Sequence, residues 1–254
     1  MSPNSCAPIA IILAAGVGRR LGSAHQSPKV LLEFGGSTLL ARHLAALAAN
    51  GIEDVAITIG HEGDMIRQAV ATLAPAQRIT FVENPDYRTG SVVSLAVQAA
   101  QLRSGRPILL MDGDVLYDQR MIGRLLAETP ENIMLVDPVL EPGDEPVKIC
   151  FREGVIVDFR KRPEHAHDWH GESVGFFRFS PQMAADLAGQ SEAYLATGKA
   201  NLEYEEAIRD LLLSEPSRFG AVDVGDLPWT EIDFEQDVAR ATNEILPQLQ
   251  GASA

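Results

Sequence analysis

Short apolar runs alternate with stretches of helical periodicity through the first half of this 254-residue chain, and this alternation restricts the fold more than any other feature. The predicted strands are 7–13, 54–59, 78–83 and 107–111, and the predicted helices between them are 38–50, 63–73 and 91–102. The alternation predicts an α/β fold, a Rossmann-like α/β/α sandwich with a mostly parallel sheet and right-handed crossovers. Sheets of this kind bind ligands beyond the carboxyl ends of their strands.

The pattern changes after about residue 130. Residues 147–161 form two alternating runs around Glu153-Gly154, which is typical of an antiparallel hairpin. A further strand is predicted at 171–179, and helices at 181–190, 201–213 and 233–249. We therefore expect a single domain over 1–254, in which the half from about 131 to 240 inserts a hairpin wall beside the sheet of the half from about 7 to 130.

Composition excludes several classes of partner. The net charge of −14 disfavours nucleic acid, because phosphate backbones are bound by basic surfaces. No apolar run approaches the roughly 20 residues that span a bilayer, and the N-terminus has no basic and apolar leader pattern. The two cysteines, Cys6 and Cys150, make no disulfide framework. We expect a cytoplasmic protein without a membrane partner; its oligomeric state does not follow from the sequence, and a homodimer is one option.

The segment after the first predicted strand is rich in glycine and cations. Gly16 and Gly18 begin a dinucleotide-like pattern, but Leu21 stands where its third glycine belongs, and Pro28 would break the helix that should follow. A Walker loop is excluded because no Gly-Lys-Ser/Thr occurs. A third kind of loop fits the segment better than either of these. In it, the glycines let the oxygens of a triphosphate approach the backbone N–H groups, and the neighbouring cations neutralise their charge. An ordinary turn with solvated arginines is the alternative.

The stretch LAAGVGRRL at 13–21, followed by Pro28-Lys29, resembles the signature of the sugar-nucleotide pyrophosphorylases, or nucleotidylyltransferases. This resemblance implies that Arg20 and Lys29 are catalytic and that the half from about 7 to 130 binds the nucleotide. It assigns these residues to nucleotide binding: Leu13, Ala14, Ala15, Gly16, Gly18 and Arg19. Arg19 replaces the threonine usual in the family, so its role is the least defined.

Two acidic motifs are candidates for a metal site. Asp112 and Asp114 directly follow the fourth predicted strand, and paired carboxylates together with substrate phosphates suit Mg²⁺; a solvated turn is the alternative. The family resemblance makes Asp114 the metal ligand and places Asp112 at the nucleotide. The segment WTEID at 229–233 resembles an element of the small-alcohol-phosphate cytidylyltransferases, which implies Asp233 as second metal ligand and Glu231 as support. On its own, the segment reads equally well as a helix cap beside a half-buried Trp229.

Further candidates lie in the later half and before the third helix. A two-residue hairpin loop would pair Lys148 with Phe159 and place Lys161 on the same face, where both lysines could receive an acceptor phosphate; solvated edge lysines are the alternative. Gly90 and Ser91 begin a predicted helix whose N-terminus could face a base or phosphate, or be an ordinary cap. The resemblance adds Glu172, Tyr204, Trp229 and Glu231 to the acceptor site.

The resemblance implies transfer of a nucleotidyl group, CMP from CTP, to a phosphorylated small alcohol such as phosphocholine, with Mg²⁺ and release of pyrophosphate. A choline group would need an aromatic or anionic cage. The candidates are Tyr194, Tyr204, Trp169 and Trp229 with Glu172, Glu203 and Glu205. Inositol-phosphate or sugar-1-phosphate acceptors remain open, as do a nucleotide-sugar glycosyltransferase and a silent nucleotide-binding domain. His165, His167 and His170 lie in a polar segment without a second ligand cluster, so we do not expect a zinc site there.

Overall fold

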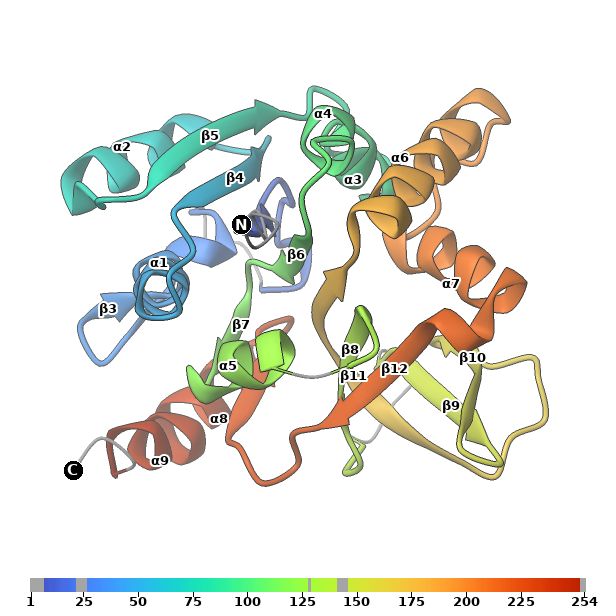
Figure 1. The fold of residues 1–254 in the computed structure, drawn as a ribbon. Helices are drawn as coiled ribbons and strands as arrows, with labels where there is room; N and C mark the ends of the chain where they lie inside the picture. The colour runs from blue at the N-terminus through green and yellow to red at the C-terminus, as the bar shows by residue number, and fades with distance from the viewer. Residues whose placement is uncertain (1–6, 22–26, 128, 141–145, 252–254) are drawn as a thin grey trace, which may run out of the picture.

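A computed structural model describes residues 7–21, 27–127, 129–140 and 146–251. Four parallel strands in the order β6-β1-β4-β5 form the first half of a nine-stranded sheet (Figure 1). They are β1 (Ile9–Leu13), β4 (Asp54–Ile59), β5 (Arg78–Glu83) and β6 (Ile108–Asp112). The register places Leu13 between Thr58 and Asp112, so the carboxyl ends of the three strands lie at one edge. The predicted α/β fold with a mostly parallel sheet is confirmed.

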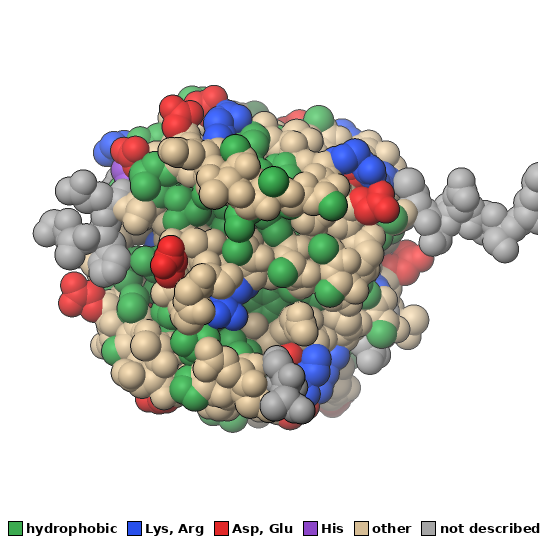
Figure 2. All heavy atoms as spheres, turned by 90° about the vertical axis from the view of Figure 1, so that its left-hand side faces the viewer, with side chains coloured by type: hydrophobic (Ala, Val, Ile, Leu, Met, Phe, Trp, Pro, Cys, Tyr) green, Lys and Arg blue, Asp and Glu red, His purple; other side chains and the backbone are tan. Residues whose placement is uncertain are grey.

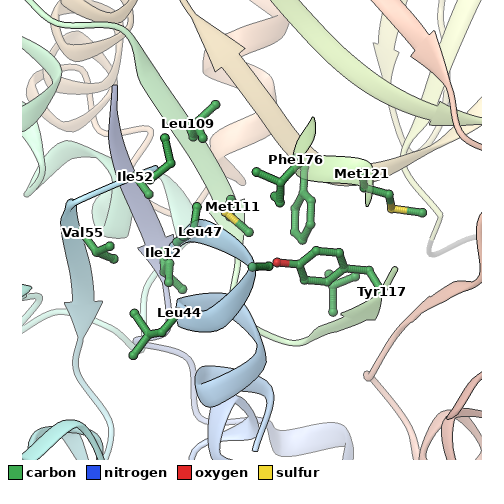
Figure 3. Packing of buried hydrophobic residues seen from close by; sticks show 14 of the residues in the cluster. Ile12, Leu44, Leu47, Ile52, Val55, Leu109, Met111, Tyr117, Met121 and Phe176 are labelled. Carbon is green, nitrogen blue, oxygen red and sulfur yellow. The ribbon is translucent and has the colours of Figure 1, made fainter. Parts of the chain in front are cut away.

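Helices cover both faces of the sheet. On one face, α1 (Leu39–Ala49) packs Leu44 and Leu47 against Ile12 and Met111 of the strands, and α2 (Gly63–Leu73) and α5 (Arg120–Ala127) join the same core (Figure 3). Thr38 caps α1 by accepting a hydrogen bond from the Ala41 amide. The other face is covered by α3 (Ser91–Ala96), α4 (Ala99–Leu102), α6 (Pro181–Ala196) and α7 (Tyr204–Ser214). Burying apolar side chains on both faces is what a parallel sheet requires.

The predicted helix 91–102 is interrupted. The chain leaves the helix after Ala96 and re-enters it at Ala99. The turn between them carries Gln98, whose fully buried side chain donates a hydrogen bond to Thr58 Oγ1 on β4, 2.8 Å away. A buried amide needs such a partner, so the polar contact to the sheet outweighs helical continuity here.

The second half extends the same sheet with antiparallel strands. Strand β11 (Trp169–Phe179) pairs antiparallel with β6 through its last residues and with β9 (Lys148–Arg152) through its first ones, while β8 (Asn132–Asp137) pairs along its opposite edge. Strand β10 (Val155–Arg160) lies beyond β9, and β12 (Phe219–Asp223) lies beyond β8. Figure 1 shows these strands to the right of the parallel half, with α6 and α7 above them. The predicted hairpin and the strand near 171–179 are therefore confirmed.

The predicted register of the hairpin is wrong. Glu153 and Gly154 do form its two-residue loop, with positive φ values of 51° and 78°. A β-bulge between Ile156 and Asp158 then shifts the pairing, so Lys148 lies opposite Arg160 rather than Phe159. The bulge is associated with the carboxylate of Asp158, which is fully buried and accepts a hydrogen bond from Arg209 Nε at 2.6 Å.

The C-terminal segment returns to the first half of the molecule. Strand β13 (Trp229–Glu231) pairs antiparallel with β7 (Val115–Tyr117), which directly follows the Asp112–Asp114 turn. The predicted helix 233–249 consists of α8 (Glu235–Arg240), a π-helical turn (Ala241–Ile245) and α9 (Leu246–Gly251). It packs in a small cluster with the hairpin of β2 (Glu33–Phe34) and β3 (Ser37–Thr38). None of the helices within the described residues is long and apolar enough to cross a membrane.

Candidate active site

A cleft of about 370 Å³ opens at the carboxyl ends of β1 and β6. It is lined by the glycine-rich loop, by the segments that lead into α3 and α7, and by acids from the ends of β6 and β13. The predicted site residues along it are Leu13, Ala15, Gly16, Gly18, Arg20, Lys29, Ser91, Asp112, Asp114, Lys161, Tyr204, Glu231 and Asp233. Ala14 lines a smaller pocket beside it, together with Gly16 and Lys29. The side chain of Arg19 lies outside the described part of the molecule. The cleft thus lies at the edge of the sheet to which the strand-end rule points.

Cations and carboxylates alternate at the floor of the cleft. Lys29 Nζ lies 2.9 Å from Asp114 Oδ2 and 2.6 Å from Asp233 Oδ1, and Arg20 Nη1 lies 3.0 Å from Asp233 Oδ2. Burial alone would lower the pKa of the Lys29 ammonium, but the charges of Asp114 and Asp233 outweigh it and raise that pKa. Lys29 is thus a cation at neutral pH.

Strand pairing explains why two acids far apart in the sequence meet. The β7–β13 ladder pairs Glu231 with Val115, and the Ile232 amide donates to the Asp114 carbonyl at 2.9 Å. Asp233 then follows β13 directly and faces Asp114 across Lys29. This short ladder brings together two acidic motifs that the whole second half of the chain separates in sequence.

Three carboxylates at this floor fit a hard divalent cation. One ligand oxygen from each of Asp114, Glu231 and Asp233 lies within 4.8 Å of the others. Carboxylate oxygens, completed by phosphate oxygens and water, are the ligands that Mg²⁺ prefers. Glu231, which the resemblance placed in a supporting role, therefore stands as close to a candidate metal position as the two aspartates.

Asp112 is held by Tyr204, the first residue of α7. Tyr204 Oη donates to Asp112 Oδ2 at 2.7 Å. Burial, together with the negative charges of Asp114 and Glu205, raises the pKa of Asp112 well above its usual value. Gly175 on β11 has φ +77°, and a Cβ at this position would stand 2.2 Å from Asp112 Oδ2. Gly175 therefore leaves the space that the Asp112 carboxylate fills.

Gly175→Ala is expected to displace Asp112 and lower turnover at least tenfold, because both the contact and the positive φ oppose a side chain there. The strain should also reduce the free energy of unfolding by about 1–2 kcal/mol. Gly189→Ala, on α6 with nothing within 4 Å of the new Cβ, is the matched control and should keep full turnover. Steady-state kinetics and urea denaturation measure the two effects; equal turnover in both variants would refute this role of Gly175.

His43 supports the acid-bearing turn from behind. It is completely buried on α1, its Nε2 lies 3.0 Å from the carbonyl of Gly113, and its Nδ1 lies 3.4 Å from Tyr117 Oη. A carbonyl can only accept, so Nε2 carries the proton and Nδ1 is left to accept from the tyrosine hydroxyl. Burial lowers the pKa of His43 to about 4. His43 therefore holds the peptide between Asp112 and Asp114 as a neutral donor, which no sequence motif indicated.

The pH dependence of stability tests this state of His43. Between the usual pKa of 6.5 and the folded value of about 4, the unfolded chain binds more protons, so stability is lost as the pH falls through that window. From pH 7 to pH 4.5 the free energy of unfolding should fall by about 2.5 kcal/mol more in the wild type than in His43→Gln, which keeps a donor at the Nε2 position but does not titrate. Denaturant titrations at both pH values measure this difference, and parallel changes in the two proteins would contradict it.

Four predicted site residues lie elsewhere. Trp229 is buried in the core, with its indole Nε1 bonded to Asp137 Oδ2 at 2.8 Å. Lys148 donates to the Lys161 carbonyl at 3.0 Å, because the bulge has moved it off the shared face. Glu172 pairs with Lys148 across β11 and β9, away from the cleft lining, and burial raises its pKa to about 7. Gly90 packs on the backbone of 200–202, where a Cβ would meet the Leu202 carbonyl at 2.2 Å.

The expected aromatic cage is not assembled. Tyr194 donates to Asp210 Oδ2 beneath α6, and Trp169 stacks on Phe151 at the far hairpin, with ring centroids 4.2 Å apart. Among the described residues, the aromatic side chains that line the cleft are Tyr87 and Tyr204. Thr89, which begins the predicted helix together with Gly90 and Ser91, also lines the cleft. Tyr87 and Ser94 were not assigned to the site from the sequence, although Tyr87 follows the end of β5 and the strand-end rule could have found it.

A second cleft, of about 320 Å³, adjoins the first and shares Arg20, Lys161, Glu203 and Glu205 with it. Arg160 and Arg162 add basic side chains to its wall, and Glu206 adds an acid. The Glu205 Oε2 atom is buried and accepts no hydrogen bond from any described residue, and burial raises the pKa of Glu205 to about 7. The two clefts together form a continuous pocket with a glycine loop and acids at one end and opposite charges side by side at the other.

A family model matches the part of the chain that carries the glycine loop and the first acidic motif. The model of the MobA-like NTP transferase domain matches residues 10–170, more than half of the chain. This protein belongs to that family. The match begins in β1 and ends in β11, so it includes the glycine loop, Lys29 and the Asp112–Asp114 turn.

Relatives of known activity are similar over nearly the whole chain. The CMP-5'-(3-aminopropyl)phosphonate synthase of Streptomyces rubellomurinus is 27% identical over 97% of this chain and 40% of its own length. The bifunctional IPC transferase and DIPP synthase of Rubrobacter xylanophilus is 28% identical over 93% of this chain and 52% of its own length. The chain thus spans about half or less of these two relatives. Among solved structures, the inositol-1-phosphate CTP transferase from T. maritima superposes with a TM-score of 0.76 at 20% identity, covering 96% of both chains, which shows the same fold.

Proposed function

We propose that this NTP transferase domain transfers CMP from CTP to a small phosphorylated or phosphonylated compound and releases pyrophosphate, with Mg²⁺ as cofactor. One observation carries the proposal: Arg20 and Lys29 meet Asp114, Glu231 and Asp233 at the floor of a cleft that begins at the glycine-rich loop. Cations and a divalent metal are what a triphosphate and a leaving pyrophosphate need. CTP is favoured as donor because relatives of both sequence and fold carry CMP or CTP in their names.

In the proposed reaction, an oxygen of the acceptor's phosphate or phosphonate attacks the α-phosphorus of CTP in line with the bond to the β-phosphate. A new P–O–P linkage forms, the α–β bridging bond breaks, and its electrons leave with pyrophosphate. No general base is required, because a phosphate monoester is already largely dianionic near neutral pH. Catalysis then rests on positioning and on neutralising charge.

The chain's own residues divide this work. The backbone of Gly16 and Gly18 approaches the triphosphate, and Lys29 and Arg20 supply fixed positive charge to it. Asp114, Asp233 and Glu231 would hold Mg²⁺, which when bound neutralises the phosphate oxygens. Tyr204 and Gly175 hold Asp112, and Ser91 Oγ bonds to Glu203 Oε2 at 2.6 Å, which joins the start of α3 to the acceptor side.

The acceptor cleft supports a compound with one negative and one positive end. The basic residues Lys161 and Arg162 suit the phosphate or phosphonate, while Glu203 and Glu205 suit an ammonium group. Arg160 and Glu206 form an ion pair with each other at 3.1 Å, so their charges compensate. The buried Glu205 Oε2 atom, which no described donor reaches, is where a ligand ammonium would gain most. Since the aromatic cage is not assembled, a primary amine fits this lining better than the quaternary ammonium of phosphocholine. An inositol phosphate is the second candidate, because the same carboxylates can accept from hydroxyls.

A pyrophosphate-release screen tests the proposal. The purified protein with Mg²⁺ is offered ATP, CTP, GTP and UTP, each against aminoalkyl phosphonates, phosphocholine, inositol phosphate, glycerol phosphate and hexose 1-phosphates. We expect release with CTP and an amine-bearing acceptor. Turnover with a hexose phosphate alone would overturn the acceptor assignment. Glycosyl transfer from a preformed nucleotide sugar, without pyrophosphate, would overturn the reaction itself.

A further inference from the structure

Another cavity, separate from the two adjoining clefts and similar in size to each of them, lies on the α1 side of the sheet. Its volume is about 350 Å³, and it is formed by β3, α1, the end of β7, the first residue of α5, and α9. No described residue lines both this cavity and the cleft that contains Lys29. Figure 2 views the side of the molecule that carries α1, α2 and α9, and a basic side chain lies there in a hollow among hydrophobic side chains. A concave site of this volume is large enough for a small organic ligand.

The cavity carries an uncompensated positive charge. Arg120 Nε and Nη2 donate to the two carboxylate oxygens of Asp118 at 2.9 and 2.6 Å, so these two charges cancel. Arg42 also lines the cavity, but it forms no ion pair with any carboxylate of the described residues. Its Nη2 donates to the Phe34 carbonyl, its Nε is buried without a described partner, and burial lowers its pKa. A half-buried arginine without a counter-ion among the described residues carries a desolvation cost that lowers the stability of the folded state, although this protein, with a net charge of −14, is rich in carboxylates.

The remaining walls suit the organic part of a ligand. Ala41, Ala45 and Leu249 present methyl groups, while Ser37 and Gln119 present a hydroxyl and an amide. Guanidinium groups bind phosphate through N–H donors. Asp118, which also lines the cavity, neutralises Arg120, so Arg42 supplies the net attraction for an anion. We propose that this cavity is a second ligand site, for a small organic anion whose phosphate group lies at Arg42 and whose body packs on the alanines of α1.

The position of this second site connects it to the acidic turn of the cleft. Tyr117 lines the cavity, and its hydroxyl lies 3.4 Å from His43 Nδ1, while His43 Nε2 lies 3.0 Å from the Gly113 carbonyl. The rings of His43 and Tyr117 stack at 5.4 Å, and Tyr117 meets Phe176 edge to face at 4.7 Å. A ligand in the cavity would therefore contact a residue that belongs to the support of Asp112 and Asp114.

Counting binding sites tests the proposal without relying on activity. CMP is the probe, titrated by calorimetry into the full chain, with inorganic phosphate as competitor. We expect two sites in the wild type and one in Arg42→Met, in which the second affinity falls at least tenfold. Inorganic phosphate should compete at the site that depends on Arg42. Arg67→Met, at a partly exposed arginine of α2 that pairs with Asp64 at 3.8 Å and Glu83 at 3.9 Å and does not line the cavity, is the matched control and should keep both sites.

A second variant keeps the test independent of any folding defect in Arg42→Met. Ala45 is exposed at the cavity, so Ala45→Phe fills the space without removing a charge, and it should also leave one site. A single site in the wild type would overturn the proposal. So would two sites that persist unchanged in both Arg42→Met and Ala45→Phe.

Discussion

Lys29→Ala should lower kcat/KM for CTP-dependent pyrophosphate release at least tenfold, a loss of about 1.4 kcal/mol of transition-state stabilisation. Among the described residues, Lys29 Nζ is the one atom that contacts both Asp114 and Asp233, at 2.9 and 2.6 Å, and Lys29 lines the cleft. Its removal takes away a positive charge where negative charge gathers on the leaving pyrophosphate. The fall should appear mainly in kcat, because the developing charge exists only in the transition state.

The same variant should also change stability in a way that a metal reverses. Without the Lys29 ammonium, the carboxylates of Asp114, Asp233 and Glu231 repel each other, so the metal-free variant should unfold at a lower temperature than the wild type. Added Mg²⁺ should raise the midpoint temperature of unfolding more in the variant than in the wild type, because it replaces the missing charge. Lys199→Ala is the control, since Lys199 lies over the Tyr194 ring outside the cleft lining. Turnover equal to that of the control would remove Lys29 from the catalytic set.

Asp114→Asn and Asp233→Asn should each lower Mg²⁺-dependent turnover at least tenfold, about 1.4 kcal/mol. Each keeps the size of the side chain but removes one of the three carboxylates that stand within 4.8 Å of one another. Fewer negative ligands weaken the binding of a hard cation, so the Mg²⁺ concentration for half-maximal rate should rise together with the loss in rate. Steady-state assays over a range of MgCl₂ concentrations, with EDTA as the zero point, measure both.

Asp226→Asn is the matched control for these two variants. Asp226 is an exposed aspartate that pairs with Arg124 at 2.5 Å and does not line the cleft. Its replacement should leave the rate and the Mg²⁺ dependence unchanged. Pyrophosphate release that is undiminished in both cleft variants would sink the metal assignment while leaving the fold and the cavity on the α1 side of the sheet untouched.

Local features explain why so much of the first half could be predicted. The helices at 38–50 and 63–73 and the strands at 54–59 and 78–83 lie within about one residue of their observed bounds. Each is set by its own apolar period and by a cap or glycine at its end, such as Thr38 before α1 and Gly51 after it. Parallel strands then place their carboxyl ends together, so the order of strands and helices along the chain is enough to expect Gly16 and Asp114 at one edge.

Contacts between distant segments explain the errors. A single extra residue at the β9–β10 bulge moves Lys148 by one position, because side chains alternate with a period of two and any shift changes the face. An indole has an apolar ring and one polar N–H, which suits a ligand site as well as a core. In the structure the Trp229 ring is buried in the core that includes residues of α5 and β8, and its N–H donates to Asp137. Neither outcome has a local signal in the chain.

The class of the fold, the glycine-rich loop with its two cations, and the two acidic motifs can be recognised from the chain alone, since each of these depends on residues that are close together in it. Tertiary structure alone decided that Asp114 and Asp233 share Lys29, that Gly175 makes room for Asp112, and that His43 holds the turn between the acids. The physical reason is the same in each case. These contacts form only when the β7–β13 ladder, β11 and α1 pack against a common core, and the energy of that packing is collective rather than local.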